Sequence, residues 1–256
     1  MRETAYAKLN LALRVRGRRP DGYHELDTLF AFAEDGDLLS VAEGEGLSLR
    51  ITGEFADRLG DPEDNLVLRA ARLLGGGGRG AALTLDKRLP VAAGIGGGSA
   101  DAAAALRLLV RWWDLGLGAA ELLALARQLG ADVPACLGSR TVRGTAKGDV
   151  LEPAHTPHGG KPLLLVNPGV PLATADVFRR WRGLPSRGND LEPPALEIAP
   201  EIGDVLEALR ASDGASLVGM SGSGATCFAV FETQAERDSA EQPLPRRWWR
   251  LSSRLR

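Results

Sequence analysis

The sequence predicts an α+β fold. Short segments that alternate apolar and polar residues fill most of the first 51 positions, and segments with apolar residues at helical spacing appear later. This order, strands first and then helices mixed with strands, is typical of α+β proteins rather than of regular βαβ arrays. A chain of 256 residues can bury a substantial core, in one large domain or two modest ones.

The first 51 residues are expected to form strands. Residues 4 to 16 alternate apolar and polar side chains, which predicts a strand with one buried face. Three short apolar segments follow, separated by acidic turns that contain glycine. They predict further strands with antiparallel pairing, at residues 26 to 32, 38 to 41 and 47 to 51.

A helix is expected next. Asp61 is a suitable N-cap and Pro62 suits a first helical turn, so the helix should run to about Leu74. The glycine-rich run at residues 75 to 80 resembles a flexible linker. Alternation returns at residues 81 to 88 and predicts another strand.

Two helices are expected in the middle of the chain. Residues 99 to 113 place apolar side chains at helical spacing. A second helix spans about residues 119 to 129 and ends at Gly130, since glycine commonly terminates a helix. The following residues, up to about residue 152, predict mainly strands.

Prolines and glycines cluster at residues 154 to 162, which indicates a boundary between two lobes. The expected domains are therefore residues 1 to 153 and 162 to 256. Beyond the boundary, the sequence predicts strands at 163 to 166 and 227 to 231 and short helices near 174 to 181 and 201 to 210.

Composition excludes several classes of protein. The formal net charge of −2 offers no global positive field for nucleic acid or an anionic membrane. Cys136 and Cys227 stand apart, which argues against a zinc site or disulfide framework and fits a reducing cytoplasm. Neither a signal peptide nor an apolar run of ~20 residues is evident. The basic, aromatic tail from Pro245 onward is expected to dock on the surface or to fray.

A glycine-rich loop at residues 90 to 101 lies directly before the strongest predicted helix. Backbone N–H groups of such a loop can close around phosphate oxygens, and a helix start adds unpaired donors. Ser99 could cap the helix and offer a hydroxyl to phosphate or Mg²⁺. The loop lacks a Walker lysine, and Ser99 replaces the last glycine of a dinucleotide fingerprint. A phosphate site of another class is therefore favoured over a plain tight turn.

Three other features are ambiguous when taken alone. The loop at residues 219 to 225 lacks a nucleophile elbow, because Ser223 stands where the motif needs glycine, and it suits a hairpin connection. Lys8 interrupts the first predicted strand and either faces solvent or points into a cleft. Asp132 follows a predicted helix end, where a turn residue is the simpler interpretation.

Together, five segments resemble the GHMP small-molecule kinases in residues and order. They are residues 5 to 10 (AYAKLN), 21 to 24 (DGYH), 90 to 100, 130 to 134 (GADVP) and 219 to 225. The resemblance covers most of the chain, since these segments and their surroundings span about residues 5 to 231. The glycine loop is shared by the whole superfamily. The first two segments are most similar to members that phosphorylate a cytidine-diphosphate-linked methylerythritol.

The resemblance implies a two-lobe GHMP kinase fold with the active site in the cleft between the lobes. It implies transfer of the γ-phosphoryl group of ATP, with Mg²⁺, to the 2-hydroxyl of the methylerythritol moiety in isoprenoid precursor synthesis. Asp132 would take the hydroxyl proton, while Lys8 would orient Asp132 and stabilise charge on the reacting oxygens. The residues expected to bind ATP are Pro90, Val91, Ala92, Ala93, Gly94, Ile95, Gly96, Gly97, Gly98, Ser99 and Ala100, with Ser99 also a candidate metal ligand.

The same resemblance places four residues at the acceptor: Asn10, Tyr23, His24 and Phe178. His24 would hydrogen-bond the cytosine, Tyr23 would stack on one face of its ring, and Phe178 would cover the other. Two alternative functions stay open. A sister kinase would act on homoserine, mevalonate or a sugar, which lack a flat base. A non-catalytic nucleotide sensor would keep the fold without needing a catalytic lysine or aspartate.

Overall fold

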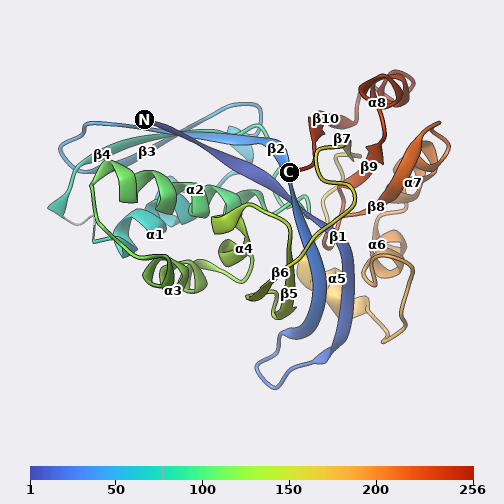
Figure 1. Cartoon of the computed structure of the whole chain (residues 1–256), viewed down its shortest axis with the longest axis horizontal. Helices are drawn as coiled ribbons and strands as arrows, with labels where there is room; N and C mark the ends of the chain where they lie inside the picture. The colour runs from blue at the N-terminus through green and yellow to red at the C-terminus, as the bar shows by residue number, and fades with distance from the viewer. Residues whose placement is uncertain (76–77) are drawn as a thin grey trace. The chain divides into compact units, whose positions relative to one another are not determined.

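The chain divides into two compact units, whose elements Figure 1 labels in sequence order. The computed structural model describes residues 1–75 and 78–256, so the expected linker at 75 to 80 falls partly outside the described residues. The first unit contains Met1–Ala7, Asp35–Val91 and Gly96–Ser139, and the second contains Lys8–Glu34, Ala92–Ile95 and Arg140–Arg256. The boundary expected at residues 154 to 162 falls inside the second unit, and the two domains based on it stay a prediction.

Two long strands run through both units. β1 (Arg2–Arg18) covers the strand predicted at residues 4 to 16 and pairs with β2 (His24–Ala42). β2 is continuous through residues 26 to 32 and 38 to 41, so the prediction of two strands separated by a turn is wrong.

The acidic segment in the middle of β2 stays extended because the sheet accommodates its glycine and its aspartate. At Gly36 a Cβ atom would clash with the backbone of Ala5, so only glycine allows this close approach. Asp37 is fully buried, and its Oδ1 accepts hydrogen bonds from the N–H groups of Arg88 and Leu89. Because these hydrogen bonds satisfy the carboxylate inside the protein, the segment does not have to turn outward to expose it to solvent.

β3 (Leu47–Thr52) and β4 (Ala81–Asp86) form the sheet of the first unit together with β2. β4 pairs antiparallel with β2, whereas β3 pairs parallel with β4. The antiparallel pairing expected for residues 47 to 51 is therefore wrong with respect to β4. A helical connection joins the two strands, and a crossover of that length permits parallel pairing.

The described part of the first unit contains four α-helices: α1 (Leu66–Leu73), α2 (Gly97–Trp112), α3 (Ala119–Leu129) and α4 (Val133–Gly138). α2 packs against α1 and α4, and its residues from Ala102 to Leu106 are fully buried. α3 ends at Gly130 as predicted. Among the described residues of the whole chain, no helix is both long and apolar enough to cross a membrane.

The helix expected from Asp61 is split in two. Asp61 does act as an N-cap, accepting a hydrogen bond from the Glu63 N–H at 3.0 Å, but it caps the 3₁₀-helix η2 (Pro62–Asp64). The side chain of Asn65 then caps α1. Another 3₁₀-helix, η1 (Ala56–Arg58), precedes this region.

The start of α2 also differs from the prediction. The helix begins at Gly97, two residues earlier than expected, and its N-cap is Gly96 in the left-handed region with φ 63°. Ser99 is consequently inside the first turn, so the prediction that it caps the helix is wrong. A glycine N-cap keeps the helix start free of a capping side chain.

The second unit is built on a four-stranded antiparallel sheet with strand order β10-β7-β9-β8. Its strands are β7 (Pro162–Asn167), β8 (Ala215–Met220), β9 (Cys227–Phe231) and β10 (Trp249–Arg254). Its helices are α5 (Thr174–Arg180), α6 (Glu192–Ile198), α7 (Glu201–Arg210) and α8 (Gln234–Glu241). β5 (Val142–Ala146) pairs with β2, and β6 (Val150–Pro153) pairs with β5.

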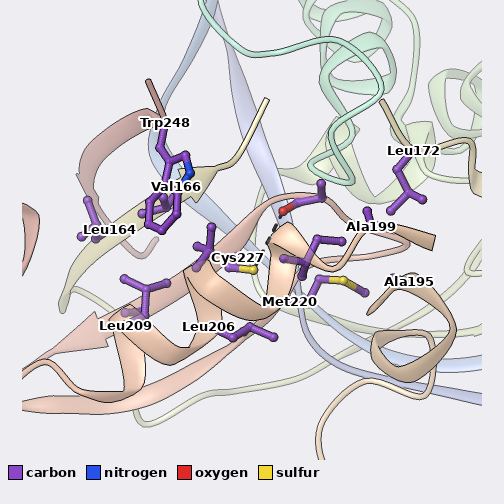
Figure 2. Packing of buried hydrophobic residues seen from close by; sticks show 14 of the residues in the cluster. Leu164, Val166, Leu172, Ala195, Ala199, Leu206, Leu209, Met220, Cys227 and Trp248 are labelled. Atoms are coloured by element: carbon purple, nitrogen blue, oxygen red, sulfur yellow. Dashed lines mark hydrogen bonds between the residues drawn. The ribbon is translucent and has the colours of Figure 1, made fainter. Parts of the chain in front are cut away.

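One face of the four-stranded sheet packs against α7. Figure 2 shows Leu206 and Leu209 of α7 near Cys227 and Leu164 of the sheet, and all four side chains are buried. Burial raises the pKa of the Cys227 thiol, so this cysteine behaves as a small apolar core residue.

The C-terminal tail belongs to this sheet, which corrects the expectation of a surface-docked or frayed end. β10 pairs with β7 along its whole length, from Trp249 opposite Asn167 to Arg254 opposite Pro162. The preceding Trp248 packs into the core (Figure 2). Backbone pairing and this buried ring hold in place a segment whose arginines had suggested a surface position.

Candidate active site

Three segments that lie far apart in the sequence meet in the second unit: β1, the loop at residues 92–95, and residues 221–226 between β8 and β9. The Lys8 N–H of β1 donates to the Ile95 carbonyl oxygen at 2.9 Å. The Thr226 N–H donates to the Ala93 carbonyl oxygen at 3.1 Å. Backbone hydrogen bonds therefore hold this half of the glycine-rich loop from both sides, and residues 221–226 form the expected hairpin connection.

Ser221 connects the three segments through its side chain. Its buried hydroxyl donates to the Gly94 carbonyl oxygen at 2.9 Å and accepts a hydrogen bond from the Asn10 N–H at 3.2 Å. Gly94 has a φ of 76°, and a Cβ atom there would lie 2.5 Å from the Ser221 carbonyl oxygen and 2.6 Å from that of Gly224. Only glycine combines this left-handed backbone conformation with the close approach of two carbonyl oxygens.

We expect Gly94→Ala to destabilise the protein by about 2–4 kcal/mol, since it combines an unfavourable backbone conformation with overpacking against two carbonyl groups. Urea denaturation followed by circular dichroism measures this loss. Gly46→Ala is the matched control, because a Cβ atom at Gly46 would meet nothing within 4 Å. Equal stability of the two variants would contradict the close approach at Gly94.

Lys8 and Asn10 lie on the same face of β1, because alternate residues of a strand point to one side. Lys8 is only 4% exposed, so the solvent-facing alternative is wrong. Its Nζ donates to Asn10 Oδ1 at 2.9 Å and lies 5.2 Å from the centroid of the Phe30 ring. Asn10 Nδ2 donates to Thr28 Oγ1 at 2.7 Å, and that hydroxyl donates to the Ala12 carbonyl oxygen at 2.7 Å. This chain of bonds fixes the position of the ammonium group.

The Asp-Gly-Tyr-His segment forms the turn between β1 and β2. The Asp21 carboxylate accepts a hydrogen bond from the Tyr23 N–H at 3.1 Å, and Gly22 supplies the left-handed backbone with φ 86°. Tyr23 is 57% exposed, and Lys147 Nζ lies 4.9 Å from the centroid of its ring. The turn thus leaves a tyrosine ring accessible directly before His24.

His24 belongs to an aromatic cluster. Its ring stacks on Phe178 with centroids 4.6 Å apart and an interplanar angle of 25°, and it meets the ring of Trp181 edge-on at 6.0 Å. Phe178 lies on α5, whose Thr174 hydroxyl shares a 2.8 Å hydrogen bond with the Ser223 hydroxyl of the β8–β9 loop. Burial, and then the charge of Arg18, lower the pKa of His24, and both favour the neutral imidazole.

The remainder of the glycine-rich loop leads into α2 in the first unit. The N–H groups of Gly97, Gly98 and Ser99 occupy the first turn, where a helix has no acceptors of its own to offer them. This end of the helix also carries the positive pole of its dipole, and both features favour an anion. Pro90, Val91 and Ala100 belong to the same unit.

Asp132 belongs to the first unit and lies between α3 and α4. It is the N-cap of α4, but its side chain makes no capping hydrogen bond. Its carbonyl oxygen accepts a hydrogen bond from the Cys136 N–H at 3.1 Å, and Pro134 suits the first turn that follows. The backbone thus starts the helix without using the Asp132 carboxylate.

Two groups of predicted residues are brought together in the second unit. Ser221 links Asn10 to Gly94, and the Lys8 ammonium donates to Asn10. His24 stacks on Phe178. Sequence patterns did not point to Thr28, Trp181 or Lys147, although they contact Asn10, His24 and Tyr23, respectively. Only Trp181 had a local signal, since it follows Phe178 by three residues on a predicted helix.

Two family models match the chain. The model described as "GHMP kinases N terminal domain" matches residues 65–140, and the one described as "GHMP kinases C terminal" matches residues 177–250. Together they cover more than half of the chain.

Relatives of known name match almost the whole length. The chain is 53% identical over 277 residues to a 4-diphosphocytidyl-2-C-methyl-D-erythritol kinase of Rhizorhabdus wittichii, covering 99% of this chain and 94% of the relative. It is 50% identical over 271 residues to the kinase of the same name from Novosphingobium aromaticivorans, covering 100% and 93%.

Solved structures agree with these relatives. A crystal structure of 4-(cytidine 5'-diphospho)-2C-methyl-D-erythritol kinase matches with a TM-score of 0.85 and 35% identity, covering 100% of this chain and 99% of that one. A homoserine kinase from Cytophaga hutchinsonii shares the fold, with a TM-score of 0.70 and 19% identity over 99% and 94% of the two chains. The chain therefore belongs to the GHMP kinases and, among them, to the family of 4-diphosphocytidyl-2-C-methyl-D-erythritol kinases.

Proposed function

We propose that this protein transfers the γ-phosphoryl group of ATP to the 2-hydroxyl of 4-diphosphocytidyl-2-C-methyl-D-erythritol, a step of isoprenoid precursor synthesis. The observation that carries the proposal is the junction at Lys8. Its backbone N–H binds the glycine-rich loop at Ile95, and its buried ammonium is fixed by Asn10. Burying a lysine costs solvation free energy, which a charge-stabilising role beside a phosphate loop would explain.

The glycine-rich loop, residues 90 to 100, would bind the ATP phosphates. Its second half supplies the unpaired N–H groups at the start of α2, and its first half is held by the Ser221 hydroxyl. Phosphate oxygens would accept hydrogen bonds from these N–H groups and would gain from the helix dipole.

A magnesium ion would accompany the nucleotide in this proposal. Within the described residues, no group of three or more histidine, cysteine, aspartate or glutamate side chains could hold a metal ion. The Ser99 hydroxyl, in the first turn of α2, would be the protein ligand of this ion, with phosphate oxygens and water as its other ligands, as is common for nucleotide-bound Mg²⁺. When bound, the ion would neutralise negative charge on the phosphates.

Asp132 would be the general base in the transfer. A hydroxyl group is a weak nucleophile at pH 7, and a carboxylate that takes its proton assists attack on the γ-phosphorus. The start of α4 does not depend on this carboxylate, because the Asp132 side chain makes no capping hydrogen bond. Lys8 would orient the carboxylate and stabilise the negative charge of the reacting oxygens. The hydroxyl proton passes to the Asp132 carboxylate, and ADP departs when its bond to the γ-phosphorus breaks.

The aromatic residues at the β1–β2 turn support a cytidine-containing acceptor. Tyr23 would stack on one face of the cytosine and Phe178 would cover the other, with Asn10 also at the acceptor. His24, whose lowered pKa favours the neutral imidazole, would hydrogen-bond the base, and its stacking on Phe178 fixes its ring plane. Homoserine and mevalonate carry no ring that such a pocket would serve, which favours the cytidine compound over the acceptors of sister kinases.

Phe178→Leu is expected to raise the KM for the cytidine substrate about tenfold, since aromatic stacking on a base contributes about 1–3 kcal/mol. The KM for ATP should change less than twofold, because the substitution keeps the site apolar and leaves the glycine-rich loop unchanged. Steady-state kinetics with each substrate varied in turn measures both values. An equal rise of both KM values would contradict a role of Phe178 at the base.

The experiment that tests the proposed function is ADP formation with Mg²⁺ and ATP against 4-diphosphocytidyl-methylerythritol, mevalonate and homoserine. Turnover confined to the cytidine compound is expected. Turnover only with another alcohol would favour a sister kinase, and nucleotide binding without turnover on any acceptor would favour a sensor.

A further inference from the structure

Arg107 of α2 joins this helix to two other segments of the first unit. Its Nη1 donates to the carbonyl oxygens of Cys136 at 2.8 Å and Leu137 at 3.2 Å, in the last turn of α4. Its Nη2 donates to the Thr4 carbonyl oxygen of β1 at 3.0 Å. Its Nε donates to Glu3 Oε1 at 2.7 Å, so one guanidinium group holds α2, α4 and the start of β1 together.

These hydrogen bonds fix α4 in a way that apolar packing does not. The side chains of Arg107 and Glu3 are 18% and 13% exposed, so both groups are largely withdrawn from water. A guanidinium group carries its N–H donors in one rigid plane, and acceptors on several sides therefore determine its position and theirs. The apolar contacts of α4 with α2 are not directional. Arg107 is thus the group that prevents α4 from sliding along α2.

The short helix α4 depends on such support. It has six residues, and a helix of this length is not stable without tertiary contacts. The last carbonyl groups of a helix have no partner within it. Arg107 supplies donors to two of them, and the Ser139 hydroxyl donates to the Cys136 carbonyl oxygen at 2.6 Å. A cation at this end also interacts favourably with the helix dipole.

The other end of α4 is Asp132, the N-cap of this helix. Cys136 connects the two ends directly, because its N–H donates to the Asp132 carbonyl oxygen at 3.1 Å and its own carbonyl oxygen accepts from Arg107. A single helical turn lies between these bonds, so a displacement of the anchored end would be passed on to the backbone of Asp132.

We infer that Arg107 is a positioning residue for Asp132: it fixes the last turn of α4 and thereby the point at which the helix begins. The inference rests on the proposed function, because it assumes that Asp132 takes the hydroxyl proton. Nucleotide binding should not depend on this contact, since Arg107 lies roughly 15 Å along the helix axis from Gly97.

Arg107→Met is expected to lower kcat about 10- to 100-fold, because small displacements of a catalytic group have effects of this size. The KM for ATP should change less than twofold. Arg111→Met is the matched control. Arg111 lies one turn further along α2 and pairs with the same Glu3, but its side chain is 52% exposed. This control should keep kcat within twofold of the wild type.

A double-mutant cycle separates the positioning of Asp132 from a general loss of structure. In an Asp132→Asn background, Arg107→Met should lower kcat less than twofold further, because the group that it positions can no longer take the proton. A further loss as large as that in the wild type would overturn the inference while leaving the kinase intact. Unchanged kcat in the single variant Arg107→Met would do the same.

Arg107→Lys keeps the test decisive if Arg107→Met does not fold. Lysine retains the positive charge, but a compact ammonium group does not replace a planar set of donors. Its kcat should therefore be lowered, and the loss should again be absent in the Asp132→Asn background. Thermal unfolding checks that each variant is folded at the assay temperature. A wild type that does not phosphorylate the cytidine substrate would overturn the proposed function and this inference together.

Discussion

Asp132→Asn is expected to lower kcat by about 10²- to 10⁴-fold, the usual contribution of a general base. Asparagine has nearly the same shape as aspartate but cannot accept the proton of the attacking hydroxyl. The fold around it should survive, because the start of α4 depends on the Asp132 carbonyl group and not on its side chain. ATP should therefore bind with unchanged affinity while turnover is lost.

Single-turnover kinetics and ATP calorimetry on the same preparation separate these two effects for Asp132→Asn. Asp57→Asn, which makes the same chemical change at an exposed position, controls for a general effect of lost charge. Turnover within threefold of the wild type would remove Asp132 from the role of base.

Lys8→Met is expected to lower kcat by about 10²- to 10³-fold, the cost of removing one preorganised charge-stabilising donor from a reaction centre. Methionine retains most of the length and apolar contact of the lysine, including that with the Phe30 ring. It cannot donate to Asn10 Oδ1, so the bond that joins Lys8 to the Asn10–Thr28 pair is lost. The effect should appear in kcat more than in the KM for ATP, because the glycine-rich loop is held to β1 through the Lys8 backbone.

Lys161→Met, at the surface ion pair with Glu232, is the matched control for Lys8→Met and should keep kcat within twofold. Thermal unfolding of both variants checks that the chain remains folded. A kcat for Lys8→Met equal to that of the control would mean that the buried ammonium has only a structural role.

Local sequence patterns predicted much of the fold, because the formation of a helix or strand depends largely on residues that are close together along the chain. The alternation in β1, the helical spacing in α3 and the apolar run of β9 all depend on neighbours along the chain. Pairing partners are not local. Nothing near residues 47 to 51 indicates a parallel partner in β4, and nothing near the tail indicates that β10 pairs with β7.

The site shows the same division between local and long-range information. Motifs singled out Lys8, Asn10 and His24, but only the folded chain shows that Lys8 is buried and that His24 stacks on Phe178. The roles of Asp132 in proton transfer and of Ser99 at a metal ion stay predictions.

The buried ion pairs of Lys87 with Asp37 and Asp101 had no sequence signal at all. The paired residues are separated by 50 and 14 residues, and each alone resembles an ordinary surface charge. Only the three-dimensional arrangement shows that these charges are buried against one another.

Identification of the phosphorylated product by ³¹P NMR tests the central claim most directly. After incubation of the protein with Mg²⁺, ATP and 4-diphosphocytidyl-methylerythritol, we predict a new phosphomonoester signal. Its integrated intensity should correspond to one phosphomonoester for each ADP formed. The 2-hydroxyl lies on a carbon that bears no hydrogen, so this signal should show no three-bond coupling to protons. A phosphomonoester split by carbon-bound protons, or ADP formed without a new phosphomonoester, would contradict transfer to the 2-hydroxyl.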